Sequence, residues 1–202
     1  TAITGPSGSG KSTLMAVLGT LTPRSGGDLR VLGMNVPIHP TARASAAIRA
    51  ATAWLPQLPL VLPGRTCLDN ALAGIRATRT ITPGDIDYTA ALFARLQVPH
   101  LLRRDVSVLS GGELQKVALI RALALGPALV LADEPTASLD AASTSLVVDA
   151  LVAASQLATL LVASHDPDVA AAADRVVALR DGQVAADATT PAGRHYKHRT
   201  RA

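Results

Sequence analysis

The chain has 202 residues, of which 49% are hydrophobic and only 2% aromatic. This length suits one domain with a small subdomain, and the scarcity of aromatic residues favours helices packed on a sheet over a β-sandwich. The formal net charge of +4 comes partly from the basic residues 189–202, for which we expect a disordered tail in preference to a phosphate- or membrane-binding segment.

The cysteine count and the hydropathy exclude several classes of protein. Cys67 stands alone, which excludes an intramolecular disulfide and a cysteine-based metal cluster and agrees with a reducing compartment. The longest apolar run, residues 122–132, is interrupted by Gly126 and Pro127 and is too short to cross a bilayer. Because the chain begins with Thr1 and not Met, we expect it to lack the N-terminus of a longer protein.

A short strand is predicted over residues 1–4, and the next nine residues read Gly-Pro-Ser-Gly-Ser-Gly-Lys-Ser-Thr, the spacing of a phosphate-binding loop. Glycine lets the backbone approach phosphate oxygens, Lys11 supplies positive charge, and the Ser12 hydroxyl can bind Mg²⁺. Apolar residues at helical spacing follow, so a helix N-terminus should face the anion, which a Gly/Ser-rich linker would not provide. The predicted nucleotide contacts here are Gly5, Pro6, Ser7, Gly8, Ser9, Gly10, Lys11, Ser12 and Thr13.

Residues 63–108 have a different character. They contain two Pro-Gly turns and a helix-like piece over residues 85–96, but no strong strand signal. We therefore expect a helical subdomain inserted into an α/β core that comprises residues 1–62 and 109–188.

The segment Leu-Ser-Gly-Gly-Glu at residues 109–113 opens a predicted helix over residues 113–125. Ser110 and Glu113 have the spacing of a capping box, but capping leaves Gly111 and Gly112 unexplained, because glycine weakens the first turn of a helix. Exposed N–H groups at a helix start bind anions. Since the first loop should suffice for one nucleotide, we expect this second element to serve a nucleotide held by another chain.

Later apolar runs predict strands over residues 128–132, 159–163 and 175–179, with a helix over residues 144–154 and a final turn and strand over residues 183–185. This alternation predicts an α/β fold with a mostly parallel sheet.

Polar residues follow two of these runs, at the carboxyl ends of strands, where open α/β sheets bind ligands. Asp133 would hold Mg²⁺ beside Ser12, and Glu134 could polarise an attacking water. A pair of acids can also simply end a strand at the surface, but the phosphate loop upstream favours the catalytic interpretation. His165 follows the next strand at the same edge.

Together and in this order, the phosphate loop, residues 109–113, the strand ending in Asp133 and Glu134, and residues 138–140 and 164–166 resemble the ATP-binding subunit of ABC transporters. The resemblance covers residues 1 to about 186. It implies a P-loop NTPase core with a helical subdomain, residues 63–108, that docks on transmembrane subunits.

The resemblance implies a role for each matching position. Residues 5–13 would be the Walker A loop, Asp133 the Walker B aspartate, and residues 138–140 a loop at the dimer seam. Glu134, His165 and Lys11 would be catalytic, with His165 bonded to the γ-phosphate. Gln57 would bind Mg²⁺ together with Ser12 and Asp133. The signature residues would close over the ATP of the opposite subunit; they are Ser110, Gly111, Gly112 and Glu113.

The implied protein binds and hydrolyses ATP with Mg²⁺ as a head-to-tail homo- or heterodimer, peripheral on the cytoplasmic face of the inner or plasma membrane. Its partners would be transmembrane transporter subunits, and we expect no nucleic acid partner. The residues of the loop and the signature favour the group that exports lipoproteins, macrolides and similar cargo, without excluding import. The aromatic residue that stacks on adenine would lie before Thr1.

Two alternatives stay open at this point. A soluble ABC-type ATPase acting on ribosomes or DNA would typically carry two cassettes or a coiled-coil insert, and the chain shows neither. A regulatory cassette without turnover is disfavoured by the intact Lys11, Asp133, Glu134 and His165.

Overall fold

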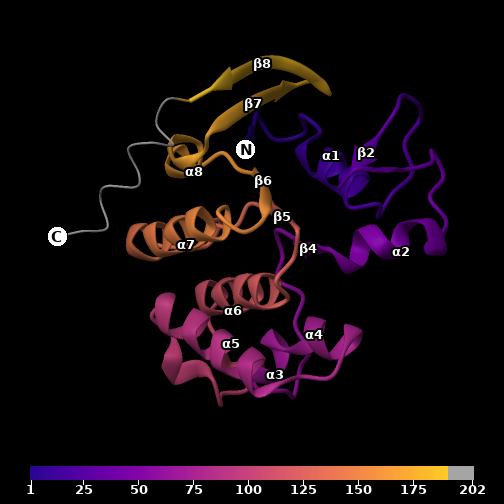
Figure 1. Cartoon of the computed structure of the whole chain (residues 1–202). Helices are drawn as coiled ribbons and strands as arrows, with labels where there is room; N and C mark the ends of the chain where they lie inside the picture. Colours follow the sequence, from indigo (N-terminus) through magenta and orange to yellow (C-terminus); the bar gives the residue numbers. More distant parts are fainter. Residues whose placement is uncertain (191–202) are drawn as a thin grey trace.

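A computed structural model describes residues 1–190, which form a six-stranded sheet in the order β4-β5-β6-β1-β7-β8 (Figure 1). The strands are β1 (Ala2–Thr4), β4 (Thr52–Leu55), β5 (Leu129–Asp133), β6 (Thr159–Ala163), β7 (Arg175–Arg180) and β8 (Gln183–Thr189). All neighbours pair in parallel except β7 and β8, which form an antiparallel hairpin. A separate hairpin joins β2 (Arg30–Val31) and β3 (Met34–Asn35). The predicted α/β fold with a mostly parallel sheet is confirmed.

Both faces of the sheet are covered, which explains the uninterrupted apolar sequence of its central strands. Along β5, Leu129 and Leu131 pack into one core, whereas Val130 and Ala132 pack into the other. Helices α1 (Lys11–Leu18) and α2 (Ala42–Ala50) lie on the first side, and α6 (Gly111–Ala124), α7 (Ala141–Ala154) and α8 (Pro167–Ala172) lie on the second (Figure 1).

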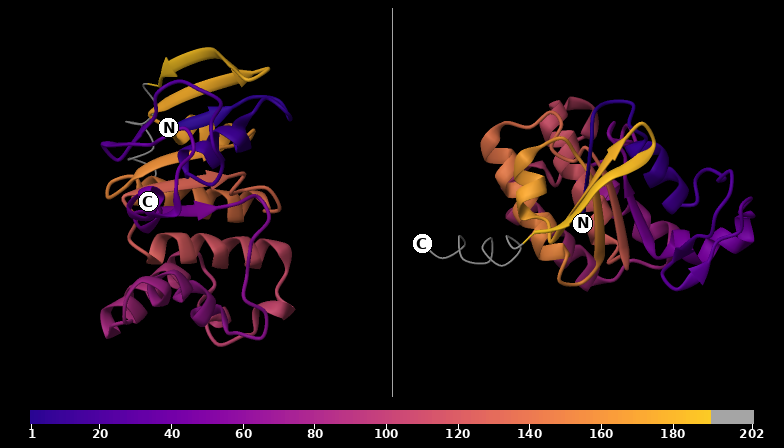
Figure 2. Two further views of the ribbon diagram at one scale, coloured as in Figure 1. Left: turned by 90° about the vertical axis from the view of Figure 1, so that its right-hand side faces the viewer. Right: turned by 90° about the horizontal axis from the view of Figure 1, so that it is seen from above.

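The segment between β4 and α6 forms a helical layer at one end of the molecule, opposite the β7–β8 hairpin (Figure 2). It contains α3 (Cys67–Ala71), α4 (Ala73–Thr78), α5 (Pro83–Arg95) and two 3₁₀ turns, Pro99–Leu101 and Val106–Val108. These helices pack on α6, which is therefore apolar around most of its circumference. The helical character expected for this segment is present, whereas the subdomain limits at residues 63 and 108 stay a prediction.

The strand register brings three strand ends to one edge of the sheet. Ala163 at the end of β6 is paired with Ile3 in β1 and with Asp133 in β5. Just beyond, the Glu134 N–H donates to the Ala163 carbonyl at 2.8 Å, and the Ser164 N–H donates to the Ile3 carbonyl at 3.0 Å. The residues that follow these strands are thus held side by side. Of the basic tail predicted for residues 189–202, residues 191–202 lie outside the described part of the chain.

Candidate functional site

The predicted phosphate loop connects β1 to α1 and surrounds the side chain of Lys11. The Lys11 ammonium is buried and donates to the carbonyls of Gly5 at 2.8 Å and Pro6 at 3.1 Å. The helix starts at Lys11 directly after the loop, so its first N–H groups and its positive dipole end face the same space as the ammonium. The loop therefore concentrates positive charge suited to a phosphate.

The glycines of this loop are required for different reasons. Gly5 has φ +144°, and a Cβ there would lie 2.2 Å from the Leu179 carbonyl oxygen of β7, so neither the conformation nor the space permits a side chain. Gly8 and Gly10 have φ values of +78° and +98° with no such close neighbour. Gly5 is fixed by packing within the fold, whereas Gly8 and Gly10 are fixed by the turn itself.

Asp133 ends β5 at the mouth of the loop and is 5% exposed. Its Oδ1 atom is buried without a hydrogen-bond partner among the described residues. A buried carboxylate oxygen without a partner is costly unless a ligand or cation satisfies it. One carboxylate beside the Ser12 hydroxyl is a ligand set that Mg²⁺ accepts when phosphate and water oxygens complete the shell, so the residues present fit this ion.

Glu134 has a left-handed backbone, with φ +48°, which is uncommon for a residue other than glycine. Its carbonyl accepts from the Ala137 N–H at 3.2 Å, and the buried Gln115 amide of α6 lies 3.5 Å away. Its carboxylate accepts from the neighbouring strand end, where His165 Nδ1 lies 3.0 Å from Oε2. The side chain of Glu134 thus lies beside the end of β6 and faces the same space as the phosphate loop.

One cavity of about 590 Å³ collects these residues. Its lining comprises Gly5, Pro6, Ser7, Gly8, Gly10, Lys11, Ser12, Thr13, Gln57, Asp133, Glu134 and His165. Gln57 reaches the cavity because β4 ends at Leu55, beside β5. Ser9 is not in the lining; it is buried and its N–H donates to the Pro6 carbonyl. Four segments far apart in sequence thus line one site.

The structure does not bring residues 110–113 to this cavity. They line a second cavity of about 660 Å³ together with Lys116, residues 138–140 and Ser143. The capping box is present: Ser110 Oγ accepts from the Glu113 N–H, and the Glu113 carboxylate accepts from the Ser110 N–H at 2.8 Å. These bonds from Ser110 hold the pKa of the Glu113 carboxyl below its usual value.

The two glycines of this second element differ. A Cβ on Gly112 would meet the Leu139 side chain at 3.2 Å and the Ser138 carbonyl at 3.4 Å. A Cβ on Gly111 would meet nothing within 4 Å, and its φ is not positive. Neither glycine N–H has a hydrogen-bond partner within residues 1–190. Packing within the chain therefore favours a small residue at Gly112 but gives no reason for glycine at Gly111.

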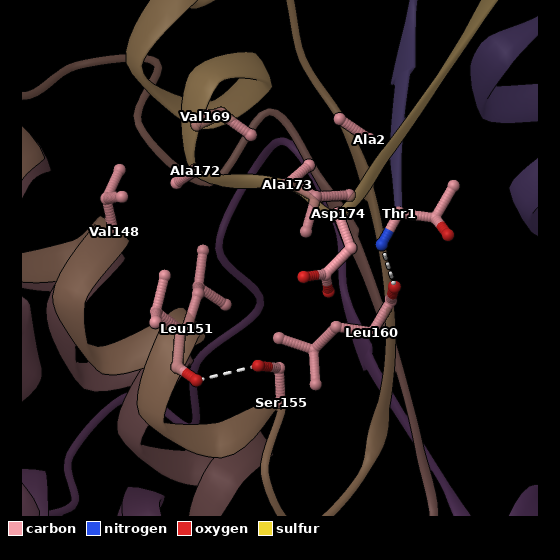
Figure 3. Close-up of a pocket in the computed structure, with 12 residues that line it drawn as sticks. Thr1, Ala2, Val148, Leu151, Ser155, Leu160, Val169, Ala172, Ala173 and Asp174 are labelled. Atoms are coloured by element: carbon pink, nitrogen blue, oxygen red, sulfur yellow. Dashed lines mark hydrogen bonds between the residues drawn. The ribbon is translucent and has the colours of Figure 1, made fainter. Parts of the chain in front are cut away.

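A third cavity, of about 50 Å³, lies at the amino ends of β1 and β6, away from the phosphate loop. Figure 3 shows its aliphatic lining, including Val148, Leu151 and Leu160, with the Asp174 carboxylate among them. It contains none of the predicted site residues, and its edge of the sheet is opposite the one where such folds bind ligands.

One residue of the site was missed by sequence reasoning. Ser164 is buried, and its hydroxyl lies 3.2 Å from the Glu134 carboxylate. The sequence shows a serine after a strand, but its partner depends on the register between β5 and β6.

The sequence of the chain is similar to that of known ATP-binding proteins of transporters. A family profile described as "ABC transporter" matches residues 1–137. The chain is 37% identical over 190 residues to the lipoprotein-releasing system ATP-binding protein LolD of Anaeromyxobacter dehalogenans, which covers 93% of this chain and 80% of the relative. It is 38% identical over 195 residues to the macrolide export ATP-binding/permease protein MacB of Nitrosomonas europaea, which covers 94% of this chain and 29% of that longer relative.

The fold agrees with solved structures of cassettes. The dimeric ATP-binding cassette MJ0796 in a post-hydrolysis state, bound to ADP and Pi, superposes with a TM-score of 0.84 at 27% identity over 93% of this chain and 84% of that one. Within residues 1–190, no helix combines the length and the apolar character needed to cross a membrane. The chain belongs to the ABC transporter family, as an ATP-binding subunit that hydrolyses ATP to power transport.

Proposed function

We propose that the cavity of the phosphate loop binds the outer phosphates of ATP and that Lys11, Glu134 and His165 carry out hydrolysis. The loop N–H groups and Lys11 hold the phosphates, and Glu134 orients the attacking water and accepts its proton. His165 donates to the γ-phosphate and helps to stabilise the charge that develops on it. The lining of one cavity by all three residues supports these roles.

We further propose that Ser12, Asp133 and Gln57 hold Mg²⁺ in this cavity. The buried, unpartnered Oδ1 of Asp133 supports this, because it is an acceptor without a donor among the described residues. When bound, the ion neutralises phosphate charge.

The signature residues serve a second copy in this proposal. Ser110, Gly111, Gly112 and Glu113 lie in a cavity separate from the phosphate loop, and Gly111 has no conformational or packing reason to be glycine. An ATP held by another chain supplies the reason, because its phosphates would approach the free N–H groups of Gly111 and Gly112. We therefore propose a head-to-tail homo- or heterodimer in which each ATP lies between the loop of one copy and the signature of the other.

The membrane partner is proposed to dock on the helical layer of residues 63–108 and on the apolar segment that precedes it. Leu58 and Leu60 lie just after Gln57 and are 78% and 67% exposed, so a partner on this surface would sit beside the nucleotide cavity.

The names of the relatives, lipoprotein release and macrolide export, favour transmembrane subunits of that group. We propose a peripheral location on the cytoplasmic face of the inner or plasma membrane, and no nucleic acid partner. The alternative of a soluble ATPase acting on ribosomes or DNA is not favoured.

The variant Glu134→Gln tests the catalytic assignment. Glutamine has nearly the same side-chain volume, and its amide oxygen can accept the hydrogen bonds from Ser164 and His165. It cannot act as the base that takes a proton from water. We expect ATP binding to be retained, turnover to fall at least about 100-fold, and ATP to hold the protein as a dimer in size-exclusion chromatography. Lys11→Ala is the matched control, because it should lose ATP affinity and give no such dimer. Normal turnover by Glu134→Gln would disprove the assignment.

A further inference from the structure

Ser164 is the only residue of the Ser164-His165-Asp166 segment whose side chain is fully enclosed, with 1% of its surface exposed. Its backbone is fixed by β1, since its N–H donates to the Ile3 carbonyl at 3.0 Å. The roles proposed above use His165 from this segment and leave Ser164 without one. A buried hydroxyl on a fixed backbone is suited to holding a neighbouring group in place.

The hydrogen bonds of the Ser164 hydroxyl define where its proton points. Oγ accepts from the Asp166 N–H at 3.1 Å and lies 3.2 Å from Glu134 Oε2. A hydroxyl has one proton, and a carboxylate oxygen can only accept, so Ser164 donates to Glu134. The Asp166 backbone is itself held, because Asp166 caps α8 through a bond from the Asp168 N–H to its carboxylate.

All the hydrogen bonds to the Glu134 carboxylate end on one of its two oxygens. Oε2 is contacted by Ser164 Oγ, by the His165 N–H at 3.4 Å and by His165 Nδ1 at 3.0 Å. Oε1 has no partner among the described residues, while Glu134 lines the nucleotide cavity. The carboxylate is thus anchored through Oε2 and has Oε1 available for a water molecule.

The contacts from His165 and Ser164 are not equivalent. The His165 side chain is 75% exposed, and a bound γ-phosphate would compete with Glu134 for its ring, whereas the Ser164 side chain is enclosed and has no other partner to turn to than Glu134 and the Asp166 N–H. Resting on the proposed function, we propose that Ser164 is a positioning residue that keeps the Glu134 carboxylate aimed at the attacking water whether His165 bonds Glu134 or the phosphate.

The test compares Ser164→Thr with Ser164→Val in the full chain, because these side chains have nearly the same shape and only threonine has a hydroxyl. We expect Ser164→Val to lower kcat for ATP hydrolysis about tenfold or more relative to Ser164→Thr, with KM for ATP within about twofold, since misaiming a catalytic group costs rate more than binding. Thr89→Val is the matched control: Thr89 is also enclosed, its hydroxyl bonds the Asp85 carbonyl at 2.6 Å, and it lies far from the cavity, so kcat should not change.

A double variant separates positioning from a general structural effect. In the Glu134→Gln background, Ser164→Val and Ser164→Thr should give the same residual single-turnover rate, because the group that Ser164 positions no longer acts as a base. Equal kcat values for the Thr and Val variants in the unmodified background would overturn the inference, and so would a full additional loss in the Glu134→Gln background. Normal turnover by Glu134→Gln alone would instead overturn the proposed function.

Discussion

At the scale of single residues, Gly5, Gly111 and Gly112 show that glycines in similar motifs have different physical causes. Gly5 is required by its positive φ and by the Leu179 carbonyl, whereas a side chain at Gly112 would only lie close to the side chain of Leu139. Gly111 has open space and no positive φ, so its absence of a side chain costs helix stability without a benefit inside this chain. A residue that weakens its own helix points to a requirement outside the chain.

Alanine substitutions at the two signature glycines should therefore differ in their effect on stability. Gly111→Ala should leave the free energy of unfolding unchanged or raise it by up to about 1 kcal/mol, yet lower ATP turnover at least tenfold, because the new methyl group meets the nucleotide of the partner copy. Gly112→Ala should gain less stability than Gly111→Ala, since its Cβ would lie 3.2 Å from the Leu139 side chain, which has to shift. Urea unfolding and an ATPase assay measure both effects. Full turnover by Gly111→Ala would argue against a shared site.

At the scale of elements, apolar runs identified β5, β6 and β7, and the turn after β7 identified the start of β8, whereas the shortest strands were missed. The run predicted over residues 159–163 has the same bounds as β6, and the run over residues 128–132 is displaced from β5 by one residue. β4 and the β2–β3 hairpin were not predicted, because they have only two to four residues and β4 alternates between buried and half-buried positions. The phosphate loop and the carboxylates were predictable from local sequence, whereas the Ser164 contact was not, because it is set by pairing between strands.

The N-terminus of α5 provides an electrostatic prediction. Arg79 donates two hydrogen bonds of 2.7 Å to the Asp85 carboxylate, which also accepts from the Thr82 N–H, and these bonds hold the pKa of Asp85 well below its usual range. The folded state thus favours the charged form. The resulting stabilisation is complete above the pKa of an unfolded aspartate, about 3.9, and is lost as the pH falls below it.

Asp85→Asn should consequently destabilise the protein at neutral pH, and the difference from the unmodified protein should shrink between about pH 5 and pH 3. Urea unfolding at several pH values measures this difference. Asp87→Asn is the control, since the Asp87 side chain makes no hydrogen bond within residues 1–190. A difference for Asp85→Asn that stays constant over this pH range would contradict the argument.

At the scale of the whole molecule, the nucleotide cavity adjoins a surface that the chain leaves exposed. Leu60→Glu should weaken co-purification of the transmembrane subunits while ATP affinity stays unchanged, because the substitution places a charge on the proposed docking segment and not in the cavity. Leu21→Glu is the matched control: Leu21 is 56% exposed and follows the end of α1, outside both the helical layer and the lining of the nucleotide cavity. Co-purification equal for the two variants would argue against this docking surface.

The central claim is that each catalytic site needs two copies of the chain, and a mixed dimer tests it most directly. One copy carries Ser110→Arg and the other Glu134→Gln, each with its own affinity tag, and the doubly tagged pair is purified and assayed for ATP turnover. Head-to-tail pairing leaves one of the two sites with an intact Glu134 and an intact facing signature, so the pair should retain about half of the normal rate, while each variant alone is inactive. A mixed pair as inactive as the two single-variant proteins would contradict the account.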